Sequence, residues 1–118
     1  PTDTPLQALI FMNDVTFVEA ARFLGQRMLK DGGGLPEDRL RYGFRLALGR
    51  APSEAEQQVL RDSLHYHLDY FTSRAKEIDA FLGVGESAPD TSLDRRALAA
   101  YASVASMLLN MDEMVTKQ

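Results

Sequence analysis

The two histidines, His65 and His67, are the side chains of this sequence best suited to metal binding or to acid–base chemistry near neutral pH. On a helix, residues two positions apart point about 160° away from each other, so these two side chains cannot hold one ion. His67 falls on an apolar stripe, and we expect a packed, hydrogen-bonded core histidine there. His65 falls on the polar side, with Asp62 at i−3 and Asp69 at i+4. We expect a solvated ion pair at His65, the alternative being a metal ligand shared with another chain.

Carboxylates are plentiful between residues 54 and 79, but their spacing is that of a solvated surface. They scatter around the polar side of a helix and do not form an acid–base pair; they are Glu54, Glu56, Asp62, Asp69, Glu77 and Asp79. The sequence contains no nucleophile elbow of the Gly-x-Ser-x-Gly kind. It also contains no cysteine, which excludes disulfides, thiolate metal sites and a cysteine nucleophile. We therefore predict no catalytic residue, no metal ligand and no cofactor-binding residue in this chain.

Two motifs resemble ligand-binding elements but lack the residues that such elements need. The run Gly32-Gly33-Gly34 would have to follow a strand and open a helix carrying Lys and Ser or Thr in order to bind phosphate. The turn LGRAPSEAE is similar to a helix-turn-helix segment, but the helix after it has six acidic residues against three basic ones. A DNA-reading helix is basic or carries base-reading side chains. The net charge of −4 also argues against a nucleic-acid partner.

The element that must organise the chain is the uncharged stretch of residues 97–111, ALAAYASVASMLLNM. A helix that is apolar on all sides is buried, and its alanines and serines let neighbouring helices approach closely. At fifteen residues it is shorter than the roughly 20 that a membrane-spanning helix needs, so we predict no membrane insertion. The sequence therefore predicts a buried central helix over about residues 93–110, capped by Thr91 or Ser92.

Start and stop signals place the other helices. Capping boxes begin at Thr4, Thr16 and Ser53, and Pro36 begins a further helix that Gly49 ends. They predict helices over about residues 5–12, 16–30, 36–48 and 54–82. At the turn before Ser53, we expect Arg50 to satisfy the preceding helix carbonyls or to pair with Glu54.

No segment alternates in the manner of a strand, so we predict an all-α fold: a bundle of about five helices in a single domain over residues 1–118. The helix over residues 54–82 would be about 43 Å long, and it must span the domain, bend or protrude.

The first predicted helix carries the candidate interaction surface. It is short and apolar on nearly every side, so its apolar side chains cannot all point inward; the surface consists of Leu6, Leu9, Ile10 and Phe11. Since the chain begins at Pro1 without a methionine, we expect a piece of a larger protein. The expected partner is the upstream part of that protein, or a second copy of the isolated chain. In the alternative, the tail of residues 111–115 covers this surface.

Three phrases, read together, are similar to a known family. They are TPLQALIFMND followed by FVEAAR, then FRLALGRAPSEAE, and finally LLNMDEMVT. In this order and spacing they resemble the C-terminal part of a bacterial family of unknown function, number 1553, also called the planctomycete-type PSD domain. The resemblance implies a large exported protein, often with a cytochrome-c-like segment upstream. It carries no activity and no catalytic residue onto these positions.

These observations together predict a non-catalytic helical packing or interaction domain of a larger exported bacterial protein. The alternative is an accessory domain to an electron-transfer or hydrolytic module elsewhere in the parent chain. The two hypotheses differ in one observable, because an accessory domain should change the spectrum or activity of that module on mixing.

Overall fold

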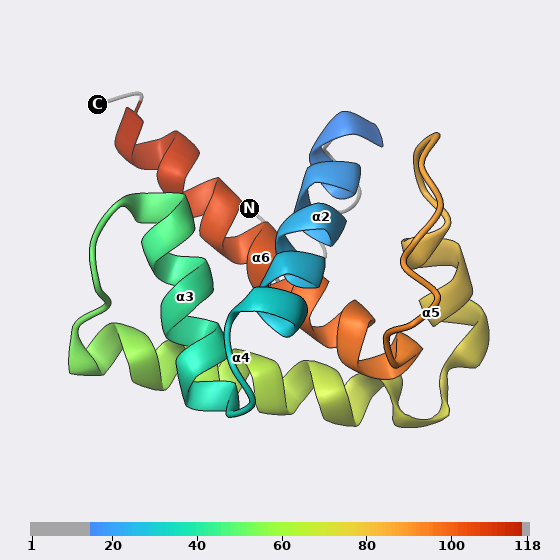
Figure 1. The fold of residues 1–118 in the computed structure, drawn as a ribbon, viewed down its shortest axis with the longest axis horizontal. Coiled ribbons are helices and arrows are strands. Elements are labelled where there is room, and N and C mark those ends of the chain that lie inside the picture. The colour runs from blue at the N-terminus through green and yellow to red at the C-terminus, as the bar shows by residue number, and fades with distance from the viewer. Residues whose placement is uncertain (1–14, 117–118) are drawn as a thin grey trace, which may run out of the picture.

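The computed structural model describes residues 15–116, and the side chains of these residues up to residue 112. Within this range the chain forms five α-helices, one short 3-10 helix and no strand (Figure 1), which confirms the predicted all-α bundle. The elements are α2 (Val15–Asp31), α3 (Pro36–Leu48), α4 (Glu54–Tyr70), η1 (Phe71–Ser73), α5 (Ala75–Leu82) and α6 (Arg95–Thr116). None of these helices has the length and hydropathy of a membrane span.

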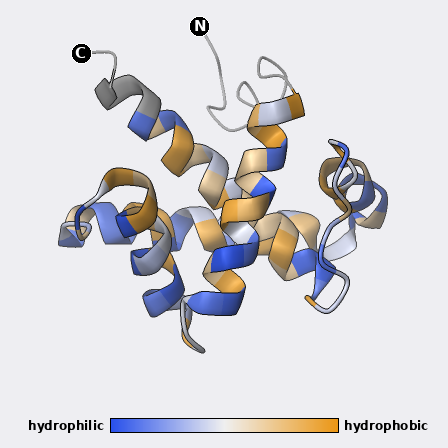
Figure 2. Ribbon diagram, turned by 45° about the horizontal axis from the view of Figure 1, so that its top comes forward, coloured by the Kyte–Doolittle hydropathy of each residue, from blue (hydrophilic) through white to orange (hydrophobic). Residues whose placement is uncertain are grey.

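Helix α6 is the central element, as predicted, and it contacts every other helix of the described part of the chain. In Figure 1 it runs diagonally through the molecule, where α2 crosses it, α3 lies to its left and α4 lies below. Its residues from Leu98 to Ala105 are all buried, and Val104 and Leu108 have no exposed surface. Hydrophobic residues accordingly gather at the middle of the molecule in Figure 2. The predicted cap was wrong: Asp94, not Thr91 or Ser92, accepts a hydrogen bond from the Ala97 backbone amide at 2.8 Å.

The backbones of α2 and α6 approach each other closely where the two helices cross, at Gly25. A Cβ atom on Gly25 would lie 2.7 Å from the Ala102 backbone nitrogen and 2.8 Å from its Cα. Contacts this short do not occur for real side chains, so α2 can reach this distance from α6 only with glycine at position 25. The small residues of α6 therefore serve the close approach that the sequence indicated.

The predicted single helix over residues 54–82 was wrong, because the chain turns after Tyr70. Side chains take over the backbone carbonyls that the helix end leaves free: Thr72 Oγ1 donates to Leu68 at 2.9 Å, and Arg74 donates to Tyr70 at 2.6 Å. The turn buries Phe71, whose ring stacks on Phe81 of α5 with a centroid distance of 6.3 Å. The turn thus brings α5 against the core, so the segment of residues 54–82 bends, which is one of the three outcomes that its length left open.

Local signals at the other helix ends had mixed outcomes. Ser53 and Glu56 form the predicted capping box, and Gly49 ends α3 in the left-handed conformation with φ of 78°. The capping box predicted at Thr16 was wrong, since Thr16 already lies inside α2. Its expected partner, Glu19, instead accepts a hydrogen bond at 2.9 Å from the backbone amide of Ser87, in the loop between α5 and α6.

Candidate functional site

The interaction surface predicted on Leu6, Leu9, Ile10 and Phe11 lies outside the described residues. It therefore stays a prediction, as does its coverage by residues 111–115, whose side chains are described only in part.

His67 is the core histidine that the sequence predicted. It is 6% exposed, and its Nδ1 lies 2.7 Å from the backbone carbonyl oxygen of Ser63. Burial lowers the pKa of His67 below its ordinary value, so the neutral ring is favoured. A neutral ring that donates from Nδ1 has a bare lone pair at Nε2, and this atom is buried without a hydrogen-bond partner. His67 thus serves as a packed side chain of the core, hydrogen-bonded to its own helix.

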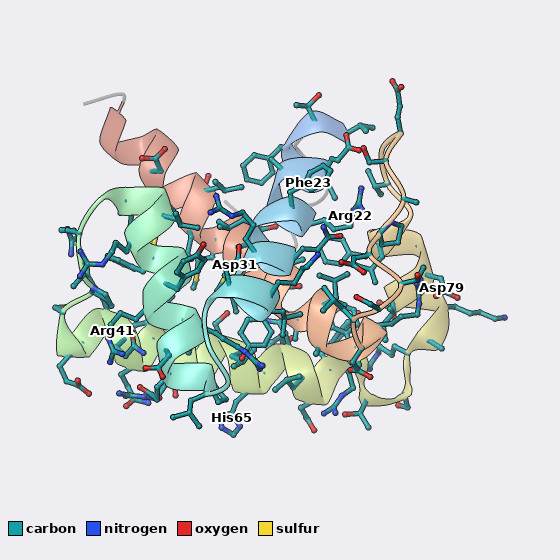
Figure 3. The ribbon with its side chains drawn as sticks, in the orientation of Figure 1. Arg22, Phe23, Asp31, Arg41, His65 and Asp79 are labelled. Carbon is teal, nitrogen blue, oxygen red and sulfur yellow. The ribbon has the colours of Figure 1, made fainter. Side chains whose placement is uncertain are left out.

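His65 extends from α4 into solvent, away from the other helices (Figure 3). The ion pair predicted for it is not among those that the described residues form, and Asp62 accepts from Gln58 Nε2 at 2.9 Å. Within the same part of the chain, no group of three His, Cys, Asp or Glu side chains could hold a metal ion.

Two clusters of charged side chains join α3 to α4. The Arg61 guanidinium lies 2.5 Å from Glu37 and 3.2 Å from Glu54. Hydrogen bonds from Arg61, and then from Gln57, lower the pKa of Glu37. These contacts fix the start of α3 on the middle of α4, which is a structural use of the acidic residues.

The second cluster corrects the expectation for Arg50. Arg50 pairs with Glu56 and not with Glu54, and it donates two parallel hydrogen bonds of 2.8 and 2.9 Å to the Glu56 carboxylate. Because Glu56 also accepts from the Ser53 amide in the capping box, Arg50 and then Ser53 lower the pKa of Glu56 to about 2. The Arg50 guanidinium at the same time lies over the Phe44 ring, 5.0 Å from its centroid. One arginine thus links a helix cap to the hydrophobic core.

Beside this cluster, an apolar groove opens between α3, α4 and α6. Its volume is about 100 Å³, and it is lined by Phe44, Glu56, Val59, Leu60, Met107 and Met111. Val59 stands at its mouth and is 55% exposed. The sequence does not predict this groove, because its walls come from three separated segments. The one signal available was Val59, an apolar residue on the otherwise polar side of α4.

The sequence also did not indicate a role for Arg22, whose side chain lies between α2 and the loop of residues 83–94 (Figure 3). The side chain is 1% exposed, and it donates to the Ser87 carbonyl at 2.6 Å. Further along α2, Lys30 pairs with Asp90 at 2.8 Å. The hydrogen bond from Lys30, followed by those from Ser92, holds the pKa of Asp90 well below its ordinary value. The loop is therefore fastened to α2 at Ser87 and at Asp90.

In the comparison with protein families, the model of PSD1, described as a protein of unknown function (DUF1553), matches residues 1–64. This region contains the first two of the phrases on which the resemblance was based, and LLNMDEMVT lies outside it. No curated protein matches the chain. No solved structure matches it either.

Proposed function

The chain belongs to the DUF1553 family, and we propose that it is a non-catalytic helical interaction domain of a larger exported bacterial protein. The observation that carries this proposal is the apolar groove between α3, α4 and α6. Apolar surface that is rimmed by charged side chains is typical of protein-binding sites. Here the Arg50–Glu56 pair lies at one edge of the groove, which Glu56 helps to line.

The use of the charged residues supports an architectural role. Arg61 joins Glu37 of α3 to Glu54 of α4, and Arg95 of α6 pairs with Asp79 of α5 at 2.7 Å. Such exposed pairs add little stability individually, but they set the register of neighbouring helices. A domain built in this way presents rigid helix faces, which favours docking without rearrangement.

The proposed partner is the upstream part of the parent protein, and export follows from the resemblance. In this proposal Leu6, Leu9, Ile10 and Phe11 add a second apolar contact to that of the groove. A second copy of the chain is the competing occupant.

The test is binding of the chain to the upstream region of its parent, measured by calorimetry, together with sedimentation of each component alone. Val59→Glu places a charge at the mouth of the groove and should weaken binding at least tenfold. Leu46→Glu is the matched control, because Leu46 is 42% exposed on α3 and does not line the groove. Phe11→Glu tests the second contact separately. Unchanged binding in Val59→Glu would refute the groove as the contact site. No binding of the upstream region, or a dimer of the chain that Val59→Glu dissociates, would refute the upstream partner.

A further inference from the structure

Two carboxylates on the outer side of α4 have no Arg or Lys partner among the described residues. Most other acidic side chains of this part of the chain do pair with Arg or Lys. Asp62 and Asp69 are both exposed, and neither is paired with a cation of the described part of the chain. Among the described residues, Asp62 accepts from the neutral Gln58 amide. The unpaired negative charge of α4 is thus concentrated within two helical turns.

An exposed aromatic side chain lies between these two carboxylates. At 100° per residue, Val59, Asp62, Tyr66 and Asp69 fall within an arc of about 80° on one side of α4. Tyr66 is 61% exposed and Val59 is 55% exposed, while the opposite side of the helix is buried at Leu60 and Leu64. Hence an aromatic ring, an apolar side chain and two carboxylates face solvent together.

A similar combination of an aromatic ring and a carboxylate, Tyr70 and Glu77, binds an arginine of this chain. The Arg74 guanidinium lies 4.1 Å from the centroid of the Tyr70 ring, and its Nε is 3.3 Å from a Glu77 carboxylate oxygen. The Tyr70 hydroxyl donates to the same carboxylate. Tyr66 stacks beside Tyr70 with a centroid distance of 6.2 Å and an interplanar angle of 18°. Arg74, Tyr70 and Tyr66 thus follow one another in steps of one turn, and Asp62 occupies the turn beyond Tyr66.

We propose that Tyr66, Asp62 and Asp69 bind an arginine side chain of the partner, in the way that Tyr70 and Glu77 bind Arg74. The planar guanidinium would stack on the Tyr66 ring while a carboxylate accepts its hydrogen bonds. An aromatic ring flanked by unpaired carboxylates is complementary in charge to this group, which is why the occupant is basic.

The groove supplies a second anchor for the same partner segment. Val59 lies at its mouth, seven residues from Tyr66, which is about 10.5 Å along the helix axis. An amphipathic helix with an apolar residue and an arginine two turns apart matches both anchors. This inference rests on the proposed function, since it names the chemistry of the partner that the groove would bind.

The test uses a fluorescein-labelled, alanine-based helical peptide of about four turns, with one leucine and one arginine seven positions apart. Fluorescence anisotropy measures its binding at low salt. Tyr66→Ala, Asp62→Asn and Asp69→Asn should each weaken binding about fivefold. A peptide with glutamine in place of arginine should bind more weakly by a similar factor, and salt should weaken binding of the arginine peptide only.

Glu86→Gln is the matched control, because Glu86 is exposed and unpaired with any cation of the described residues, but lies outside α4. Its binding should equal that of the parent chain. Equal binding of the arginine and glutamine peptides would overturn the inference, and so would equal losses in Glu86→Gln and Asp69→Asn. If the upstream region binds through Val59 but is insensitive to Tyr66→Ala, the proposed function stands and this inference fails.

Discussion

The contact between α2 and α6 should make Gly25→Ala a destabilising substitution, although alanine is the better helix former. The added Cβ would meet the Ala102 nitrogen at 2.7 Å, the Ala102 Cα at 2.8 Å and the Tyr101 carbonyl carbon at 3.1 Å. All three are backbone atoms, so no side-chain rotation can relieve the overlap. One of the two helices must move, and the neighbouring contacts of α6 must move with it.

The magnitude follows from two opposing effects. Overpacking a core costs about 1–3 kcal/mol, and the upper end applies here because the obstruction is backbone. The gain in helix propensity from glycine to alanine is about 1 kcal/mol. We therefore expect the free energy of unfolding to fall by about 2 kcal/mol, and the melting temperature by about 8 °C for a domain of this size.

Chemical denaturation followed by circular dichroism measures this difference. Gly34→Ala is the matched control, because a Cβ on Gly34 would have no atom within 4 Å. Its unfolding free energy should stay within about 0.5 kcal/mol of the parent value. A Gly25→Ala variant as stable as the control would show that α2 and α6 do not approach this closely.

Three further predictions concern the core, the buried histidine and the loop. Val104→Asp should lower the unfolding free energy by more than about 4 kcal/mol or prevent folding, because it places an unpaired charge at a fully buried position. Val59→Asp, at an exposed position, should keep the fold, and thermal melts of both variants measure the difference. Burial lowers the pKa of His67 below 6.5, so the unfolded state binds more protons than the folded state. The free energy of unfolding should therefore fall as the pH drops below about 6.5. Urea titrations at several pH values should show a weaker pH dependence of this free energy in His67→Gln. Arg22→Met keeps the buried volume but removes the hydrogen bond to Ser87, and we expect faster amide hydrogen exchange in the loop of residues 83–94 and unchanged exchange in α6.

The helices that could be predicted from the sequence are those whose limits depend on neighbouring residues. The Ser53–Glu56 capping box and the Gly49 terminus need only a few adjacent residues, and both are present in the structure. The break after Tyr70 has no such signal, since no glycine or proline lies near it. It depends on the contact of Phe71 with Phe81, ten residues further on, and such a contact is not visible in helical periodicity.

The same limit applies to the candidate site. The role of His67 could be predicted because its place on the apolar stripe of α4 determines its burial. The groove could not, since Phe44, Val59 and Met107 come together only when three helices pack. The arrangement of Arg50 with Glu56 was missed for a related reason: several acidic residues lie within its reach along the sequence, and only the packed structure selects one.

Glu19 and Glu56 show how packing decides between two uses of one pattern. Each is the fourth residue of a capping-box sequence, and from sequence alone the two are equivalent. Glu56 accepts from the Ser53 amide of its own helix end and from Arg50, so it completes the local cap. Glu19 lies beneath the loop that follows α5, where Gly85 has φ of 98° and a Cβ would come within 2.6 Å of the Glu19 carboxyl carbon. Because Gly85 has no side chain, the loop can approach the Glu19 carboxylate closely. The Ser87 backbone amide then donates to this carboxylate, in place of the backbone amide of a local cap. The choice between a local and a long-range partner is therefore made by a residue far along the chain, and for this reason the capping box at Ser53 could be predicted and the contact of Glu19 could not.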